Sequence, residues 1–228
     1  MKDTIENLFK TFDLNLFLKE NFDLNSIEVP EEMPKFWVDI PTSDNWDPLG
    51  FTKELTLRDA YIKKGMFGFV SWKWINPFAE WLNGRKCLEL MAGRGWLSYA
   101  LSLKDINIIA TDNFSWHEHH SKWNDTLVDI EKIDAVKAVE KYASQVDVVI
   151  ISWPYKGSET YNSLKTLNKF NPDALFVFIG EQDEGVCADK EFFNHLKEIE
   201  DEDFLAVKQN FQSWKGIYDR IILGKYIN

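Results

Sequence analysis

The sequence predicts an α/β protein with a doubly wound, mostly parallel sheet in a three-layer α/β/α arrangement, an antiparallel C-terminal hairpin strand and an N-terminal helical and irregular lobe. From Gly84 onward, short apolar runs alternate with helical stretches, which is typical of parallel strands joined by crossover helices. The last two apolar runs follow each other with no helical pattern between them. We therefore expect these two runs to pair as an antiparallel hairpin at the sheet edge.

The N-terminal lobe, residues 1–83, divides into three parts by pattern. Residues 1–23 carry apolar side chains at helical spacing and predict one or two short helices, the first capped by Asp3 or Thr4. Four prolines between residues 25 and 50 interrupt regular structure. Residues 51–83 are again helical and rich in aromatic residues, which we expect to pack against the sheet rather than to form a stacking platform for a substrate.

The second region, residues 84–228, contains the expected sheet. Its predicted parallel strands are 86–90, 107–111, 130–133, 146–152 and 174–180. Its predicted helices are 95–103, 115–126, 135–143, 159–169 and 190–198. The predicted hairpin strands are 204–209 and 218–226.

Composition narrows the classes of partner and compartment. The chain has 228 residues, 26 Lys and Arg against 37 Asp and Glu, and a net charge of −11, so duplex nucleic acid is an unfavourable partner. Only two cysteines are present, far apart, which argues against a disulfide framework or a zinc site. Without a signal peptide pattern or an apolar run near ~20 residues, we expect a cytoplasmic protein that spans no membrane. The oligomeric state is not readable from the sequence.

The stretch Cys87–Leu97 runs from an apolar strand through a glycine-containing turn into a helix. Glycine allows a tight turn and a close approach of ligand to backbone, and the start of the helix offers free N–H groups. This geometry suits a nucleotide-like ligand. Gly93-Arg94-Gly95 alone is a weak signal.

Acidic residues follow the next two strands. Asp112 ends the second strand, where a carboxylate can accept hydrogen bonds from both hydroxyls of a ribose. Asp134, followed by Ala135, stands after the third strand and could accept from an adenine amino group. For both aspartates a helix cap is the alternative role.

The fourth strand ends in Ser152-Trp153-Pro154-Tyr155, which places a polar side chain and flat rings at the carboxyl edge of the sheet, where open α/β sheets bind ligands. Packing of the two aromatic rings at the mouth of a cleft is the alternative.

Together these features make the region from about Cys87 to Tyr226 resemble a class I S-adenosylmethionine-dependent methyltransferase. The resemblance rests on the Glu-x-x-Ala-Gly-x-Gly turn, the acid ending strand two, the Asp-Ala pair after strand three and the closing antiparallel hairpin. It implies that residues 84–228 form the domain that binds S-adenosylmethionine, which acts as co-substrate. Residues 1–83 would then cover the substrate.

The resemblance also implies roles for individual residues. Ala92, Gly93 and Gly95 would pass close to the methionine part, with Glu89 holding the turn. Asp112 would hold the ribose, and Asp134 with Ala135 the adenine. The implied cofactor set is completed by Met91, Asn113 and Ser152.

The acceptor would face residues 152–155, which are the implied catalytic residues Ser152, Trp153, Pro154 and Tyr155. This stretch resembles the Ser/Asn/Asp-Pro-Pro-Tyr element of amino-group methyltransferases, with Trp153 in place of the first proline. A small molecule or exposed group with a polar acceptor is implied, with nitrogen favoured over oxygen. A second departure is Met91, which stands where the family commonly has glycine.

Other interpretations of the same residues stay open. Gly93-x-Gly95-x-x-Ser98 is a degenerate dinucleotide fingerprint, so a nicotinamide-dependent oxidoreductase is the alternative enzyme. A non-catalytic protein that keeps the fold and binds a partner through residues 1–83 is the third. Candidates for a general base are His117, His119 and Glu181, and we expect the histidines of 117–120 to be surface residues rather than metal ligands.

Overall fold

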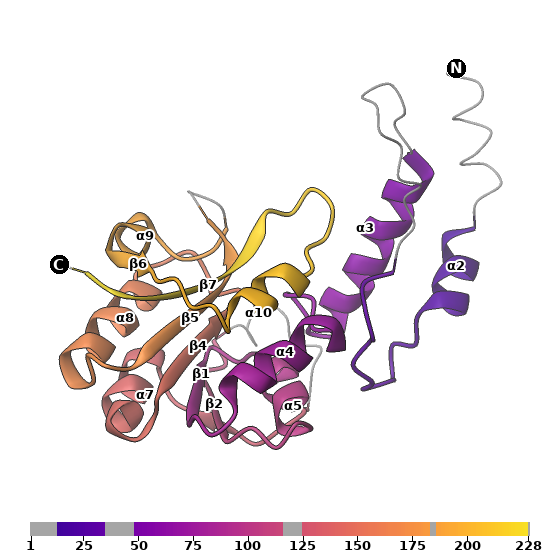
Figure 1. Ribbon diagram of the computed structural model, residues 1–228. Helices are drawn as coiled ribbons and strands as arrows, with labels where there is room; N and C mark the ends of the chain where they lie inside the picture. Colours follow the sequence, from indigo (N-terminus) through magenta and orange to yellow (C-terminus); the bar gives the residue numbers. More distant parts are fainter. Residues whose placement is uncertain (1–12, 35–47, 116–124, 183–185, 228) are drawn as a thin grey trace.

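The structure is a computed structural model that describes residues 13–34, 48–115, 125–182 and 186–227 (Figure 1). Its centre is a seven-stranded sheet with the strand order β3-β2-β1-β4-β5-β7-β6. The strands are β1 (Cys87–Leu90), β2 (Ile108–Asp112), β3 (Ile130–Lys132), β4 (Val148–Ser152), β5 (Leu175–Glu181), β6 (Leu196–Glu198) and β7 (Asp219–Tyr226). Within this described sheet β7 alone runs opposite to the other strands, since it pairs antiparallel with both β5 and β6.

The predicted fold class is confirmed, because helices cover both faces of this sheet (Figure 1). The helices are α2 (Leu14–Asn21), α3 (Pro48–Lys63), α4 (Trp72–Leu82), α5 (Trp96–Ser102), α7 (Ala135–Tyr142), α8 (Glu159–Phe170), α9 (Lys190–His195) and α10 (Leu205–Asn210), with a 3-10 turn η1 (Ala143–Gln145). None of the helices in the described ranges has the length and hydropathy needed to cross a bilayer.

Alternating side chains of the buried strands build two separate cores. Val148 and Ile150 of β4 join the core that contains residues of α4, α5 and α10, whereas Val149 and Ile151 join the core beneath α7, α8 and α9. Because side chains alternate across a strand, a strand buried on both faces is apolar throughout. This explains why the central strands show as continuous apolar runs in the sequence.

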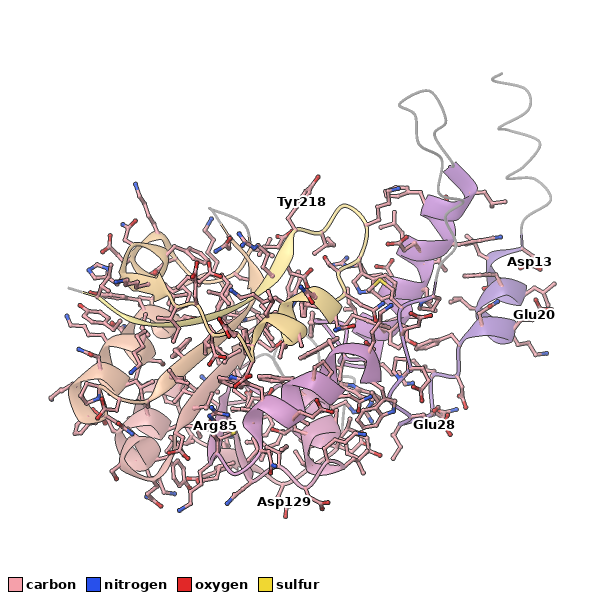
Figure 2. The ribbon with its side chains drawn as sticks, viewed as in Figure 1. Asp13, Glu20, Glu28, Arg85, Asp129 and Tyr218 are labelled. Atoms are coloured by element: carbon pink, nitrogen blue, oxygen red, sulfur yellow. The ribbon has the colours of Figure 1, made fainter. Side chains whose placement is uncertain are left out.

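Most of the described aromatic residues of the N-terminal lobe belong to the sheet's own core or pack against it. Trp74, Phe78 and Trp81 of α4 are buried: Phe78 and Trp81 pack with Phe204 beside α10, and Trp74 packs with Phe78. The prediction that these rings pack rather than bind is confirmed for α4. In Figure 1, α2 and α3 lie side by side beyond the end of the layered body. Glu20 of α2 lies on the outer side of this pair in Figure 2.

One predicted hairpin strand is wrong. Residues 204–209 form helix α10 instead of a strand, since Phe204 and Val207, three residues apart, are both buried against α4. The strand that pairs with β7 is β6, so the predicted helix 190–198 ends at His195 and its last three residues are extended. A six-residue apolar run is compatible with either helix or strand, and tertiary packing decides between them.

Some predictions concern residues outside the described ranges. They include the first N-terminal helix with its caps Asp3 and Thr4, and most of the helix expected at 115–126. The other predicted parallel strands and crossover helices agree with the structure to within one to three residues at their ends.

Candidate functional site

A cavity of about 440 Å³ opens at the carboxyl edge of the sheet, at the ends of β1, β2 and β4. This volume is within the range of roughly 300–1,000 Å³ found for small-molecule sites, and the place is the one where open α/β sheets bind ligands. Of the predicted site residues, the following line it: Glu89, Met91, Ala92, Gly93, Asp112, Asn113, Ser152, Trp153, Pro154 and Tyr155.

The turn after β1 has an unusual backbone. Met91, Gly93 and Gly95 all have positive φ angles, of 54°, 59° and 87°. The left-handed conformation costs glycine little and costs other residues about 1–2 kcal/mol. Met91 therefore has the left-handed backbone conformation that favours glycine. This agrees with the glycine that is common at this position in the family that the sequence resembles.

Hydrogen bonds within the protein hold this turn. The amide of Gly93 donates to Oδ2 of Asp112 at 2.7 Å, that of Ala92 to the carbonyl of Thr111 at 3.0 Å, and that of Gly95 to the carbonyl of Ala92 at 2.8 Å. A Cβ on Gly93 would meet no atom within 4 Å, so the turn presents open space there. The turn is therefore preformed, with its Gly93 face on the cavity.

Glu89 is buried at the end of β1 and also faces the cavity. Its Oε2 accepts hydrogen bonds from both the amide, at 3.1 Å, and the hydroxyl of Ser98 in α5. Burial raises the pKa of Glu89 to about 7, and the two bonds from Ser98 oppose that rise. Glu89 thus ties the turn to the first turn of helix α5, and Ser98 serves this contact.

Three predicted cofactor residues lie elsewhere. Gly95 does not line the cavity. A Cβ there would lie 2.9 Å from Cγ2 of Val128, so this glycine permits a close contact within the protein. Asp134 caps α7 by accepting from the amides of Val136 and Lys137, and neither it nor the buried Ala135 lines the cavity. The capping role of Asp134 is the one the structure shows.

Like Met91 in the turn after β1, Trp153 after β4 has a strained backbone. Trp153 has a φ of 51°, a value that the ring of proline forbids, because proline holds φ near −65°. The backbone therefore departs here from the Pro-Pro-Tyr element that the sequence resembles. Tyr155 is 56% exposed at the rim, and burial of part of its ring raises the pKa of its phenol.

One whole wall of the cavity was not predicted from the sequence. The segment between α3 and α4 contributes Gly65, Met66, Phe67, Gly68 and Val70. Further residues not singled out are Trp96, Leu97, Ser115, Lys156, Glu159 and Val186. The only available signal was the pair of glycines in Gly65-Met-Phe-Gly68, which separates two helices. Phe67, unlike the aromatic residues of α4, faces the cavity.

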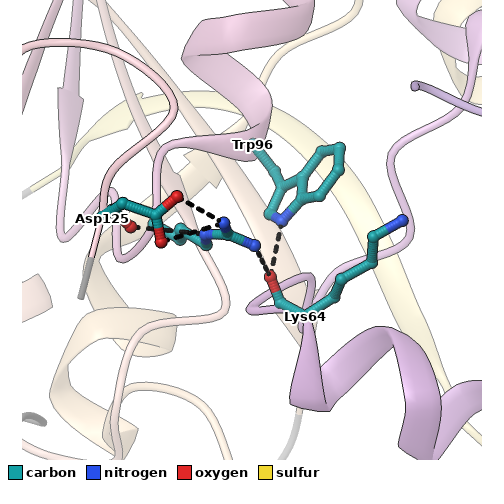
Figure 3. A network of polar contacts seen from close by, with 4 residues as sticks. Lys64, Trp96 and Asp125 are labelled. Atoms are coloured by element: carbon teal, nitrogen blue, oxygen red, sulfur yellow. Dashed lines mark hydrogen bonds and ion pairs between the residues drawn. The ribbon is translucent and has the colours of Figure 1, made fainter. Parts of the chain in front are cut away.

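A polar network joins this wall to the glycine turn (Figure 3). The carbonyl of Lys64 accepts from Nη1 of Arg94 at 2.9 Å and from the indole of Trp96 at 3.0 Å, while Arg94 also pairs with Asp125 at 2.9 Å. The Lys64 ammonium, almost fully buried, lies 4.8 Å from the ring centre of Phe22 and 5.5 Å from that of Trp96. The end of α3 is thereby fixed to the turn.

Of the general-base candidates, Glu181 is among the described residues, and it lies outside the cavity lining. It ends β5 and accepts a hydrogen bond from the amide of Tyr218 at 3.3 Å. His117 and His119, with the rest of 117–120, and the loop residues 183–185 lie outside the described residues.

No protein-family model and no curated protein matches the chain. A solved structure described as MtNAS in complex with MTA and tNA has 9% identity and a TM-score of 0.45, covering 78% of this chain. The chain spans 66%, just under two thirds, of that protein's length.

Two further solved structures have comparable scores. The TehB-like SAM-dependent methyltransferase from Corynebacterium glutamicum has 10% identity, a TM-score of 0.46, and coverage of 77% of this chain and 99% of that one. The 1,6-didemethyltoxoflavin-N1-methyltransferase from Burkholderia thailandensis has 14% identity, a TM-score of 0.42, and coverage of 84% and 94%.

These identities and TM-scores assign no activity. The fold is evident from the sheet itself, in which five parallel strands continue through the reversed β7 to β6. A mostly parallel, helix-covered sheet with this one antiparallel hairpin strand gives the chain the Rossmann-like fold that the resemblance to class I methyltransferases implied.

Proposed function

We propose that this protein is an S-adenosylmethionine-dependent methyltransferase that acts on a polar acceptor, most simply an amino nitrogen of a small molecule or an exposed group. The observation that carries the proposal is the preformed left-handed turn of residues 91–95, which borders a small-molecule cavity at the carboxyl edge of β1 and is held by Asp112.

The charge of the cavity supports a cationic ligand. Among the described residues that line it, Glu89, Asp112 and Glu159 carry carboxyl groups and Lys156 carries an ammonium. S-Adenosylmethionine brings a sulfonium and an ammonium, and it supplies a methyl group that is already activated for transfer. An acidic lining attracts such a ligand.

The hydrogen bonds of the glycine turn weigh against a dinucleotide as the ligand. A pyrophosphate needs free backbone N–H groups or cations at the glycine turn. The amides of Ala92, Gly93 and Gly95 all donate to oxygen atoms of the protein. The turn is therefore better suited to the amino-acid part of a methyl donor than to the phosphates of a nicotinamide cofactor.

In the proposed reaction the chain's residues position the reactants. Asp112 would hold the ribose, and Gly93, which has no side chain, would let the methionine part approach the backbone. Ser152 and Tyr155 would hold the acceptor so that its lone pair faces the methyl carbon opposite the sulfur. The carbon–nitrogen bond forms as the carbon–sulfur bond breaks, and the acceptor's proton leaves to solvent. Alignment of the two reactants is the source of rate.

Isothermal titration with S-adenosylhomocysteine tests the proposal. We expect a dissociation constant in roughly the micromolar range, and no heat or fluorescence change with NADH. Absence of binding to the folded protein would remove the proposal. Binding without release of S-adenosylhomocysteine in a broad acceptor screen would favour the non-catalytic, partner-binding alternative.

The compartment belongs to the same proposal. Cys87 and Cys187 are both free and buried, and burial raises the pKa of their thiols to about 12 and about 11. Two unreactive, unpaired cysteines are compatible with a reducing compartment, and we propose the cytoplasm.

A further inference from the structure

Trp153, at the end of β4, is held in its strained conformation by contacts on several sides. Its backbone amide donates to the carbonyl of Ile179 at 2.7 Å. Its indole Nε1 donates to Oδ2 of Asp219 at 3.1 Å. A bulky residue at positive φ persists only where the surrounding structure supports it, and these two bonds provide that support.

Gly68 closes the other side of the indole. A Cβ on Gly68 would lie 2.7 Å from Cδ1 and 3.2 Å from Nε1 of Trp153. The Cδ1–Nε1 edge of the ring therefore packs against Gly68, and its Nε1 is also bonded to Asp219, the first residue of β7. No space remains for the ring to shift toward Gly68.

Asp219 supports the indole from behind the cavity wall. Its side chain is buried and does not line the cavity, whereas its neighbour Tyr218 is 80% exposed and points away from the body (Figure 2). Burial raises the pKa of the Asp219 carboxyl, and the hydrogen bond from the indole of Trp153 opposes that rise. The hydrogen bond to Trp153 thus connects Asp219 to the lining of the cavity.

The position of Trp153 in the cavity determines what the hydrogen-bonded pair of Trp153 and Asp219 can affect. The glycine turn follows β1 and is bonded to the end of β2, whereas Trp153 and Tyr155 line the cavity where the chain leaves β4. We infer that Asp219 is a positioning residue that fixes the indole of Trp153 as the wall limiting the size of the acceptor to a small group next to the transferred methyl. This inference rests on the proposed function.

The size limit can be measured without knowing the acceptor. The probes are S-adenosylhomocysteine analogues in which nitrogen replaces the sulfur and carries a methyl, propyl or benzyl substituent that projects toward the acceptor end. Isothermal titration of each probe against the wild type defines a size series. We expect the benzyl probe to bind at least roughly tenfold more weakly than the methyl probe.

Variants then separate positioning from simple stability. In D219A the indole loses its partner, and the benzyl penalty should fall below about threefold, as it should in W153A, where the wall is gone. In D219N the amide oxygen still accepts from the indole, so the wild-type series should return. All Asp219 variants should bind S-adenosylhomocysteine within about threefold of the wild type, because Asp219 lies outside the cavity.

The outcomes are distinguishable from those of the proposed function. If the wild type binds no S-adenosylhomocysteine, the proposed function fails and the inference with it. If it binds but shows no size penalty, or if D219A and D219N both keep the wild-type series, the inference alone is overturned. Should D219A fail to fold, W153F replaces it: the phenyl ring cannot donate to Asp219, and we expect its benzyl penalty to fall as well.

Discussion

The backbone amide of Gly93 donates a hydrogen bond of 2.7 Å to Oδ2 of Asp112, so the acid at the end of β2 shapes the turn that follows β1. Its other oxygen accepts from the amide of Phe114 at 2.6 Å, and the side chain is only 4% exposed. One buried carboxylate thereby fixes the ends of two neighbouring strands. Asp112, which is predicted to hold a ribose, therefore also stabilises the turn that the ligand would contact.

Replacing Asp112 should therefore affect both binding and stability. In D112A two backbone amides lose a charged acceptor, which we expect to lower the free energy of unfolding by about 3 kcal/mol. Affinity for S-adenosylhomocysteine should fall at least roughly tenfold. Urea unfolding and isothermal titration measure the two effects.

Asp147 offers a control for D112A. Its Oδ2 accepts from the amide of Lys86 at 2.8 Å, at the opposite edge of the sheet. D147A removes one exposed bond from a carboxylate to a backbone amide, far from the cavity, and should leave S-adenosylhomocysteine affinity unchanged. Equal losses of affinity in both variants would show that Asp112 has no local role.

Gly95 should tolerate alanine less well than Gly84 does. Both have positive φ, 87° and 78°, but a Cβ on Gly95 would lie 2.9 Å from Val128, whereas one on Gly84 meets nothing within 4 Å. G84A then carries only the cost of the left-handed backbone, about 1 kcal/mol. G95A adds overpacking of about 1–3 kcal/mol. Chemical denaturation of the two variants gives the difference, and equal stability would exclude the predicted clash.

At Met91 we also expect glycine to be more stable than alanine, although the natural residue there is not glycine. Its φ of 54° is unfavourable for any residue with a Cβ. M91A and M91G both lose the packing of the methionine side chain, but only M91G also loses the backbone strain. M91G should therefore be more stable than M91A by about 1 kcal/mol in thermal or urea unfolding. A more stable M91A would show that the turn does not need the left-handed conformation.

The buried carboxyl of Glu89 should make stability depend on pH. Burial raises its pKa in the folded state from 4.5 to about 7, so the folded protein binds more protons than the unfolded chain between these values. The favourable contribution of Glu89 to the free energy of unfolding is complete below pH 4.5, declines as the pH rises, and is lost above about pH 7. Each unit of difference corresponds to about 1.4 kcal/mol.

The comparison with E89Q isolates this effect, because all other titrating groups are shared. Relative to E89Q, the wild type should lose up to about 3 kcal/mol of unfolding free energy between pH 4.5 and pH 8, measured by urea unfolding at several pH values. A difference that stays constant over this range would mean that Glu89 titrates normally despite its burial.

Much of the sheet was predictable because its signals are local. The runs of β1, β4 and β5 are buried on both faces, so their composition alone predicts strands. Asp112 and residues 152–155 follow strands that end at one edge, and parallel topology brings them to a common cavity. The glycine turn was recognisable for the same reason.

Tertiary structure decided the features that depend on distant partners. Residues 204–209 became helix α10 because α4 provides a surface for Phe204 and Val207, and no local pattern contains that surface. Asp134 caps a helix although its position in the sequence equally suited a ligand. The wall from Gly65 to Val70 reaches the cavity through the link between Lys64 and Arg94, thirty residues further along the chain.

The sequence by itself thus determined which segments become strands and which strand ends carry chemistry, since burial and turn formation depend on nearby residues. Only the folded structure decided the left-handed backbone of Met91 and Trp153 and the contact of Trp153 with Asp219, 66 residues later. Such conformations are unfavourable locally and exist because long-range packing and hydrogen bonds offset their cost.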